Sequence, residues 1–338
     1  WIAVPFWLGD RIAMWVLQQQ QSAFASFAEQ VWSWFEVGSL VVLPVALVSG
    51  FQFPVLIALA GSGQQDVGKH VGWTFAANTC GAICGAIAGG FFLLPALNAI
   101  GVWRLSVLML LVLGLTLVCV SRLWQVSRFG ISLASGLALL ALLGVVQQGP
   151  TAAWRHSGIG AGRAELEDGS RNAEQNFINT KRRQLLWETE GVESSIGITA
   201  TDSLSFIVNG KSDGNAYTDA GTQMGLGLLG PVLKSDLKTG LVIGLGTGET
   251  VGWLADAISG PVDVVELEPG VLDMARRCES MNRRVLSQPD VHIYHNDARE
   301  FLLTSAAEYD IIISEPSNPY RAGIANLYTR EFYASAAD

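Results

Sequence analysis

Three acidic residues in the last third of the sequence each follow a short apolar run. Glu266 follows VDVV, Asp297 follows VHIYHN and Glu315 follows DIIIS. If these runs are strands of one parallel sheet, the three carboxylates lie at its carboxyl edge, where open α/β sheets bind ligands. A carboxylate in that place can accept hydrogen bonds from ribose hydroxyls or from an amine, and it can act as a general base.

A glycine-rich turn follows a further apolar run. Gly244, Gly246 and Gly248 form the pattern GLGTG, with Thr247 inside it. Glycines let the backbone turn tightly and approach a bound nucleoside at the start of the next helix. A dinucleotide-binding fingerprint would need a third glycine where this chain has Glu249, so the shorter spacing instead resembles the S-adenosylmethionine-binding Rossmann class.

The three acids have specific expected partners in an adenosyl ligand. Glu266 lies 22 residues after the first glycine of the turn, where an acid can accept both ribose hydroxyls. Asp297, followed by Ala298, lies where such folds bind the adenine amino group, and Glu315 faces the reaction centre. Each acid alone could be a solvated strand end, and Glu315 could simply cap the turn over 316–319. Together they predict an adenosyl-binding site.

Strands and helices that alternate must position these residues. We expect strands at 240–246, 262–268, 291–297 and 309–315, and helices at 248–259, 270–283 and 298–306. This alternation predicts a parallel, doubly wound sheet, and we assign 236–338 to a Rossmann-like adenosyl-binding domain. The chain stops inside the helix after the fourth strand, so this domain is expected to be incomplete and the chain to be a fragment.

Short β segments precede this domain. LLWETEG, SSIGITAT and LSFIVNG are predicted strands, with Thr201-Asp202 and Asn209-Gly210 as turns. We assign 184–235 to an N-terminal β-strand subdomain. The polar stretch over 149–183 is predicted to be a linker.

The first half of the chain is strongly apolar. The whole sequence is 50% hydrophobic and only 15% charged, and the long apolar runs lie at 37–60, 74–97, 103–120 and 129–148. Each run is close to the ~20 residues that a helix needs to cross a bilayer, so 37–148 is predicted to hold four transmembrane helices. Residues 1–36 are expected to be an extramembrane, amphipathic segment or the end of a preceding span.

Charge and ligand types exclude other functions. The middles of the predicted spans contain no Asp, Glu, Lys or His, which favours an anchor or scaffold over an ion transporter. The net charge of −9 argues against a nucleic-acid partner. The histidines and cysteines form no metal-binding pattern, so the expected partners are the lipid bilayer and a small molecule, and a homo-oligomer is left open.

The motifs together resemble a known family. LVIGLGTGET, VVELEPGVLDMAR, NDAREFL and ISEPSNPYRAGIANLYTREFY in the second half, and LPVALVSGFQFPVLIAL with FAANTCGAICGAIAGGFFLLP in the first, resemble the polyamine aminopropyltransferases (spermidine synthases). Within that family they are most similar to bacterial membrane-fused spermidine synthase-like proteins. The resemblance implies an integral protein of the bacterial inner membrane, with its soluble domain in the cytoplasm.

The resemblance also implies a reaction. Decarboxylated S-adenosylmethionine would give its aminopropyl group to an amine such as putrescine, with Glu315 at the position of the family's catalytic acid. Gln223 and Asn318 would bind the substrate, and Tyr217 and Asp219 are further candidates. Two positions depart from the family, because Asn318 stands where a second acid is usual and Thr247 stands where an acid grips the donor amine.

These departures leave three functional classes open. The first is a membrane-anchored aminopropyltransferase of polyamine biosynthesis. The second is a methyltransferase that uses intact S-adenosylmethionine, which Thr247 favours. The third is a non-catalytic nucleoside-binding regulator of the membrane portion. No metal cofactor is expected in any of them.

Overall fold

The structure is a computed structural model. It describes residues 1–21, 26–60, 66–122, 127–147, 152–160, 162–200, 203–316, 319 and 323–337. The chain divides into two compact units, Trp1–Ile178 and Asn179–Asp338, with the boundary inside a helix. Each unit is described by itself. The predicted site residue Asn318 and the predicted turn at Thr201-Asp202 lie outside the described residues.

The first unit is built from helices. They are α1 (Pro5–Gln21), α2 (Phe27–Ala60), α3 (Val67–Ala88), the π-helical segment η1 (Gly89–Leu93), α4 (Leu94–Arg122), α5 (Arg128–Val145), α6 (Ala152–Arg155) and α7 (Arg171–Gln184). A helix therefore covers each of the four apolar runs, as predicted. The helix α2 begins ten residues before its run, within the segment that we assigned outside the bilayer.

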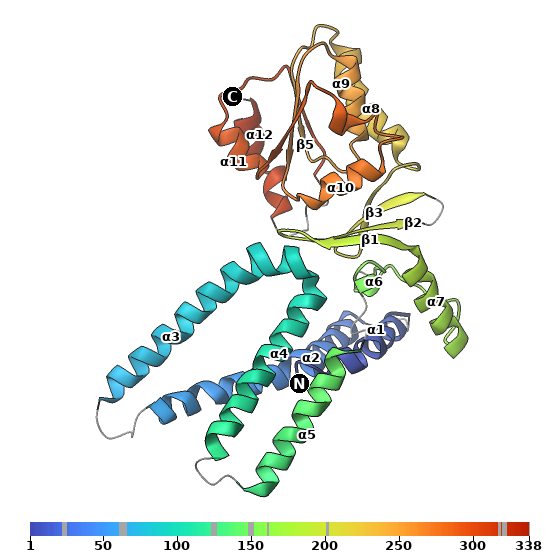
Figure 1. Cartoon of the computed structure of the whole chain (residues 1–338). Coiled ribbons are helices and arrows are strands. Elements are labelled where there is room, and N and C mark those ends of the chain that lie inside the picture. Colours follow the sequence, from blue (N-terminus) through green and yellow to red (C-terminus); the bar gives the residue numbers. More distant parts are fainter. Residues whose placement is uncertain are drawn as a thin grey trace. The chain divides into compact units, whose positions relative to one another are not determined.

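A kink at Asn98 separates the second and third apolar runs, where a break was expected. The helix α3 continues through η1 into α4, and Asn98 inside α4 has φ 58° and ψ 169°. Asparagine is one of the few non-glycine residues that adopt positive φ readily. The kink reverses the direction of the chain, so that α3 and α4 run in opposite directions (Figure 1).

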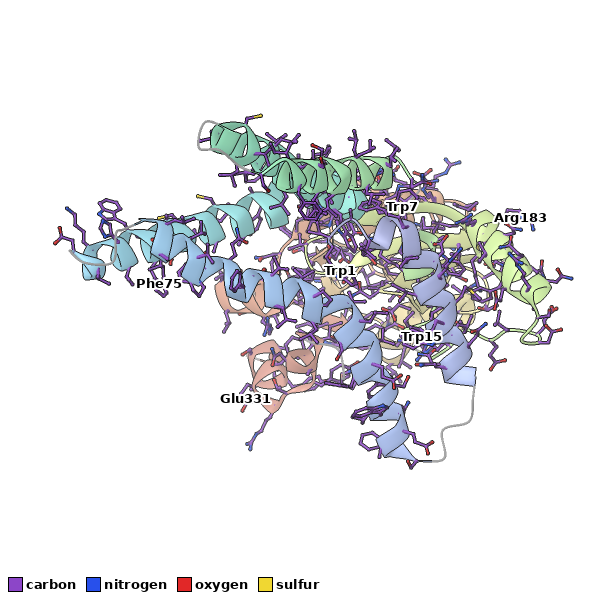
Figure 2. All side chains as sticks on the ribbon, turned by 90° about the horizontal axis from the view of Figure 1, so that it is seen from below. Trp1, Trp7, Trp15, Phe75, Arg183 and Glu331 are labelled. Atoms are coloured by element: carbon purple, nitrogen blue, oxygen red, sulfur yellow. The ribbon has the colours of Figure 1, made fainter. Side chains whose placement is uncertain are left out.

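The long helices expose their apolar side chains. Phe27–Leu59 and Val67–Val120 are long and apolar enough to cross a membrane, and Phe129–Val145 is a shorter apolar helix. Almost none of the residues in the two long segments are buried within the protein, and α3 has no buried residue at all. Phe75 on α3, labelled in Figure 2, is 52% exposed although it packs edge-to-face on Phe53 of α2.

Small cores hold the remaining helices of this unit. Phe6 of α1 packs with Val107 of α4 and Val145 of α5. Phe177 of α7 stacks on Trp154, with ring centroids 5.6 Å apart. The prediction of a plain polar linker over 149–183 was therefore wrong, because apolar residues at helical spacing on α7 are enough to form a packed face.

The second unit begins with an antiparallel sheet of four strands in the order β1-β2-β3-β4. The strands are β1 (Leu185–Glu190), β2 (Ser195–Ala200), β3 (Leu204–Val208) and β4 (Lys211–Asn215). The three predicted strands are confirmed. The fourth was not predicted, since KSDGN contains the residue types that strands usually lack. The turn between β3 and β4 has positive φ at Asn209 (49°) and Gly210 (78°), which suits a tight hairpin.

A parallel sheet of four strands follows, in the order β7-β6-β5-β8. Its strands are β5 (Gly240–Ile243), β6 (Val262–Glu266), β7 (Val291–His295) and β8 (Ile311–Ser314). The helices are α8 (Ala220–Leu233), α9 (Glu249–Ala257), α10 (Gly270–Arg277), α11 (Ala298–Thr304) and α12 (Arg330–Ala337), with short 3₁₀ turns η2 (Val285–Ser287) and η3 (Ile324–Tyr328). The predicted parallel sheet is confirmed, and α8 adds a helix in the subdomain for which only strands were predicted.

Alternate side chains of the central strand enter two cores. Val242 packs in a core with residues of α9 and α10 and of the antiparallel sheet, such as Ile196. Leu241 and Ile243 point to the other face, where they pack with Phe332 of α12 and with residues of α11. This alternation is the two-residue period of a strand that is buried on both faces. The doubly wound arrangement is therefore confirmed.

Candidate adenosyl-binding site

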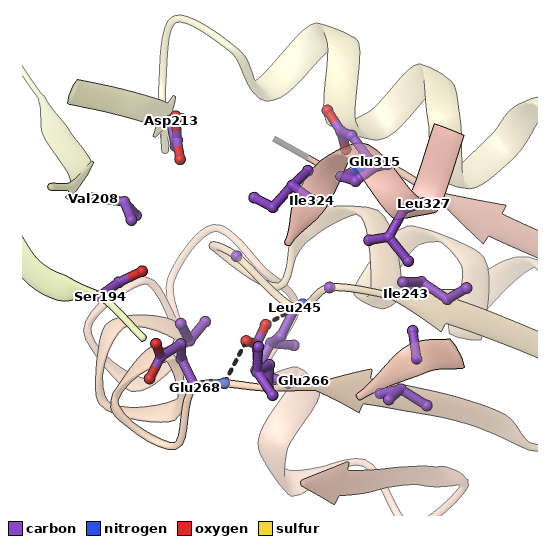
Figure 3. Close-up of a pocket in the computed structure, with 18 of the residues that line it drawn as sticks. Ser194, Val208, Asp213, Ile243, Leu245, Glu266, Glu268, Glu315, Ile324 and Leu327 are labelled. Carbon is purple, nitrogen blue, oxygen red and sulfur yellow. Dashed lines mark hydrogen bonds between the residues drawn. The ribbon is translucent and has the colours of Figure 1, made fainter. Parts of the chain in front are cut away.

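A pocket of about 470 Å³ lies at the carboxyl ends of the parallel strands. Most of the predicted site residues line it: Gln223, Gly244, Gly246, Thr247, Glu266, Asp297, Ala298 and Glu315. The antiparallel sheet supplies another part of its wall, with residues from Glu193 to Gly214. Figure 3 shows Glu266 and Glu268 in one part of the pocket and Glu315 and Asp213 in another.

The glycine turn has the backbone that its sequence predicts. The φ angles are 90° at Gly244, 53° at Gly246 and 85° at Gly248, a region that L-residues rarely adopt. Gly248 is the N-cap of α9 and does not line the pocket. It is needed for packing instead, because a Cβ there would come within 2.8 Å of Cγ1 of Val285.

Glu266 joins the glycine turn to the end of β6. Its two carboxylate oxygens accept the backbone N–H of Leu245 at 2.8 Å and of Glu268 at 2.9 Å (Figure 3). Burial raises the pKa of this carboxyl, while the two N–H donors and His295 act in the opposite direction. An oxygen of a carboxylate has two lone pairs, so each oxygen keeps one for a ribose hydroxyl.

Asp297 has a partner that the sequence did not suggest. It caps α11 by accepting the N–H of Arg299 at 2.8 Å, and its second oxygen lies 2.5 Å from Nη2 of the same residue. The Arg299 guanidinium lowers the pKa of Asp297. Both carboxylate oxygens are therefore engaged, and Arg299 itself lines the pocket beside Ala298.

Glu315 lines the pocket directly after β8 and remains solvent-accessible. Partial burial raises its pKa, and the negative charge of Asp219 raises it further. A carboxyl with a raised pKa is a better proton acceptor than an ordinary one. The next residue, Pro316, is held from the far side of the pocket, since the hydroxyl of Tyr328 in η3 donates to its carbonyl at 2.9 Å.

Thr247 and Gln223 form a buried neutral pair. The Thr247 hydroxyl donates to the side-chain oxygen of Gln223, and the two residues are 3% and 9% exposed. Both line the pocket. The side of the glycine turn that was expected to grip the donor amine therefore presents a hydroxyl and an amide, without a charge.

Two predicted substrate-binding residues lie outside the pocket lining. Tyr217 is 71% exposed, and Asp219 is the N-cap of α8, with Oδ2 accepting the N–H of Asn215 at 2.8 Å. Asp219 still acts on the site through its charge, which raises the pKa of Glu315. For Tyr217 the structure shows no contact with the pocket.

Glu268 is a site residue that the sequence analysis missed. Its oxygens accept the N–H of Val192 at 2.6 Å and of Glu193 at 2.7 Å, so it ties the turn between β1 and β2 to the end of β6. A Cβ at Gly191 would lie 1.9 Å from its Oε2, so this turn needs a glycine. The only available signal was the Glu-Leu-Glu spacing that places Glu266 and Glu268 two residues apart.

Lys211 and Asp213 of β4 were also missed. Nζ of Lys211 lies 2.8 Å from Oδ1 of Asp213, and the side chains are 15% and 8% exposed. Alternate residues of a strand share a face, so both line the pocket. No strand was predicted at these residues, so the sequence offered no reason to place Lys211 and Asp213 on the same face.

The charge of the described pocket lining is negative. Six carboxylates line it, from Glu193, Asp213, Glu266, Glu268, Asp297 and Glu315, against the two basic side chains of Lys211 and Arg299. Such a pocket favours a cationic ligand. The described ranges contain no group of three His, Cys, Asp or Glu residues placed to hold a metal ion.

One buried acid lies close to this site without lining it. Glu249 at the start of α9 is 2% exposed, and its Oε1 has no hydrogen-bond partner in the described part of the chain. Burial raises its pKa, and the charge of Asp219 adds to the effect. This is the residue that replaces the third glycine of a dinucleotide fingerprint.

Part of the chain is similar to known proteins. Residues 224–338 match the family model of the spermine/spermidine synthase domain. A polyamine aminopropyltransferase of Alkaliphilus oremlandii is 37% identical over 101 residues, which cover 29% of this chain and 35% of the relative. One of Mycobacterium tuberculosis (strain H37Rv) is 27% identical over 332 residues, which cover 89% of this chain and 57% of the relative.

Two solved structures show weaker similarity to this chain. A spermidine synthase in complex with the transition-state analogue AdoDATO has a TM-score of 0.43 and 20% identity, over 46% of this chain and 54% of that chain. The enzyme from Thermotoga maritima has a TM-score of 0.41 and 21% identity, over 46% and 53%. By the family model and the curated relatives, residues 224–338 of this chain are similar to the spermine/spermidine synthase domain, and the chain spans about a third to just over half of the length of these relatives.

Proposed function

We propose that this protein is a spermidine synthase-type aminopropyltransferase. The donor is decarboxylated S-adenosylmethionine and the acceptor is a small amine. The observation that carries the proposal is one acidic pocket that brings together the glycine turn, Glu266, Asp297 and Glu315 within a spermine/spermidine synthase domain. The donor carries a sulfonium and an ammonium, and six carboxylates in the lining suit both positive charges.

The proposed transfer has one proton to remove. An amine with a pKa near ~10 is protonated at neutral pH and cannot attack until a base takes its proton. Glu315 accepts that proton. The nitrogen lone pair then attacks the carbon next to the sulfonium, a C–N bond forms, the C–S bond breaks, and sulfur leaves with the electron pair as the thioether of methylthioadenosine.

The other pocket residues hold the donor. Glu266 accepts ribose hydroxyls with the lone pairs that its two N–H donors leave free. Leu245 and Ala298 supply apolar surface for the nucleoside, while Asp297 stays ionised because Arg299 lowers its pKa. These groups orient the sulfonium carbon for attack.

Methyl transfer from intact S-adenosylmethionine is the second candidate function. The uncharged Thr247–Gln223 pair favours it, because no acid stands where a decarboxylated donor would need its ammonium held. The two functions predict opposite donor preferences. A non-catalytic nucleoside-binding role predicts binding without turnover of either donor.

We also propose that the first unit anchors the protein in the inner membrane of a bacterium, with the adenosyl site in the cytoplasm, where the donor is made. The support is physical, since two helices are long and apolar enough to cross a bilayer and leave these residues almost entirely unburied. The alignment with the mycobacterial relative covers 89% of the chain, so it includes this unit.

Calorimetric titration of the full-length protein in detergent tests the proposal. S-adenosylmethionine, its decarboxylated form and methylthioadenosine are the ligands, and Glu266→Ala is the control variant. We expect the decarboxylated donor to bind more tightly than the intact one, to lose affinity in Glu266→Ala, and to turn over with putrescine or another amine. Preference for the intact donor would favour methyl transfer, and no binding of any of the three would overturn the adenosyl site.

A further inference from the structure

The wall of the pocket formed by β4 contains an ion pair that the proposed transfer does not use. Lys211 and Asp213 lie 2.8 Å apart and are mostly buried. They line the same pocket as Glu315. In the view of Figure 3, Asp213 and Glu315 come from separate elements, and both lie above Glu266 and Glu268.

Fold stability gives little reason for this pair. Lysine and aspartate are both uncommon in strands, and a buried ion pair is frequently no more stabilising than two apolar side chains of similar size. A pocket wall is a different environment, because a bound ligand can use the charges. The position of the pair therefore points to recognition.

Lys211 has donors to spare. An ammonium group has three N–H bonds, and one of them goes to Asp213. No other protein partner of Lys211 occurs in the described part of the chain. A cation with free donors in an otherwise acidic pocket can bind a carboxylate, while Asp213 and Glu315 can bind an ammonium.

We propose that this pocket recognises an α-amino acid group. Lys211 binds its carboxylate and Asp213 faces its ammonium, while Glu315 remains the base for the amine of the side chain. The inference rests on the proposed aminopropyl transfer and narrows the acceptor from a plain diamine to an amino acid with an amine in its side chain. Intact S-adenosylmethionine carries the same group, so the test must separate acceptor from donor.

Two matched pairs of ligands make that separation. Ornithine differs from putrescine by one carboxylate, and S-adenosylmethionine differs from its decarboxylated form in the same way. Affinities of all four are measured by calorimetry on the full-length protein in detergent, and the acceptors are titrated in the presence of methylthioadenosine. We expect ornithine to bind about tenfold or more tightly than putrescine, the effect of a charge-assisted hydrogen bond.

Lys211→Met is expected to abolish this difference and to leave the affinity for methylthioadenosine unchanged. Lys238→Met, which removes an exposed lysine outside the pocket, should retain the difference. Because Lys211→Met leaves Asp213 buried without its cation, Lys211→Met/Asp213→Asn is the second variant. It removes both charges and should also lose the preference for ornithine.

The outcomes separate the two proposals. A preference for the carboxylated ligand that depends on Lys211 but occurs only in the donor pair would overturn the assignment to the acceptor and would favour methyl transfer from the intact donor. Binding of methylthioadenosine without any such preference in either pair would overturn this inference and leave the proposed function standing. Failure to bind methylthioadenosine would overturn the proposed function itself.

Discussion

The two units of this chain treat apolar side chains in opposite ways. In Asn179–Asp338 the large apolar residues enter two cores, one on each face of the parallel sheet. In Trp1–Ile178 only small clusters around α1 are buried, and α2, α3 and α4 expose most of their Leu, Val and Phe side chains. Exposed apolar surface costs about 25 cal/mol per Å² in water, so the exposed helices of the first unit fit the proposed membrane anchor, and the second unit shows no comparable surface among its described residues.

The two units also differ in where their acidic residues lie. Six of the described carboxylates of the second unit line one pocket, whereas the middles of the long apolar helices contain no acidic residue. A site that handles cations needs charges, and charges are costly inside a bilayer. The proposed anchor and the proposed adenosyl site therefore lie in different parts of the chain.

The largest predicted difference between the two units is their response to a lysine at an exposed leucine position. Leu113 of α4 and Leu186 of β1 are 57% and 54% exposed. If α4 faces lipid, Leu113→Lys costs about 2.5–3.5 kcal/mol of insertion free energy. Leu186→Lys faces water and should change stability by less than about 0.5 kcal/mol.

The measurement is the fraction of each variant that remains in membranes after alkaline extraction. A loss for Leu113→Lys alone is the expected result. Equal membrane retention of both variants would show that the exposed face of α4 does not meet lipid.

Removal of a leucine side chain should lower the free energy of unfolding much more at a buried position of the second unit than at an exposed position of the first. Leu241 of β5 is fully buried, so Leu241→Ala should lower the free energy of unfolding of the second unit by about 2–5 kcal/mol. Leu110→Ala, at a position 55% exposed on α4, should lower stability by less than about 1 kcal/mol in detergent. Thermal unfolding followed by tryptophan fluorescence gives both values, and similar losses for the two variants would contradict the assignment of buried and exposed faces.

A smaller effect is expected at the buried acid of α9. Burial and Asp219 raise the pKa of Glu249, so the folded state binds the proton more tightly than the unfolded state. Stability from this group is then greatest below the unfolded pKa of about 4.5 and falls as pH rises through the folded pKa. Glu249→Gln should stabilise the protein at pH 7 by an amount on the order of 1 kcal/mol.

Melting temperatures from pH 4 to pH 8 test this prediction. The gain from Glu249→Gln should shrink as the pH is lowered. Glu331→Gln, an exposed acid of α12, is the control and should show no such trend. A gain that is independent of pH would rule out a buried carboxylate as the cause.

The smallest predicted effect concerns the base. The charge of Asp219 contributes to the raised pKa of Glu315, so Asp219→Asn should lower that pKa. Because the base must be deprotonated, the acid limb of the pH–rate profile should move to lower pH while its plateau stays the same. Asp219 would be a direct substrate ligand, and not only a nearby charge, if the variant instead raised KM at every pH.

The sequence by itself predicted the local secondary structure and which acidic residues follow each strand. Apolar runs predicted every strand of the parallel sheet and the helices over the four long runs of the first unit, whereas α6 and α7 were not predicted. Strand-end positions predicted that Glu266, Asp297 and Glu315 would share an edge, since parallel strands end on the same side. The pocket contains all three, as expected.

Only the tertiary structure decided how those residues are paired. Glu268 binds N–H groups 75 and 76 residues earlier in the chain, and Lys211 and Asp213 join the site through a strand that the sequence did not suggest. Tyr217 and Asp219, close to Gln223 in sequence, do not line the pocket with it. Such contacts depend on which strands and turns meet in space, and the periodicity of apolar residues in the sequence does not specify this.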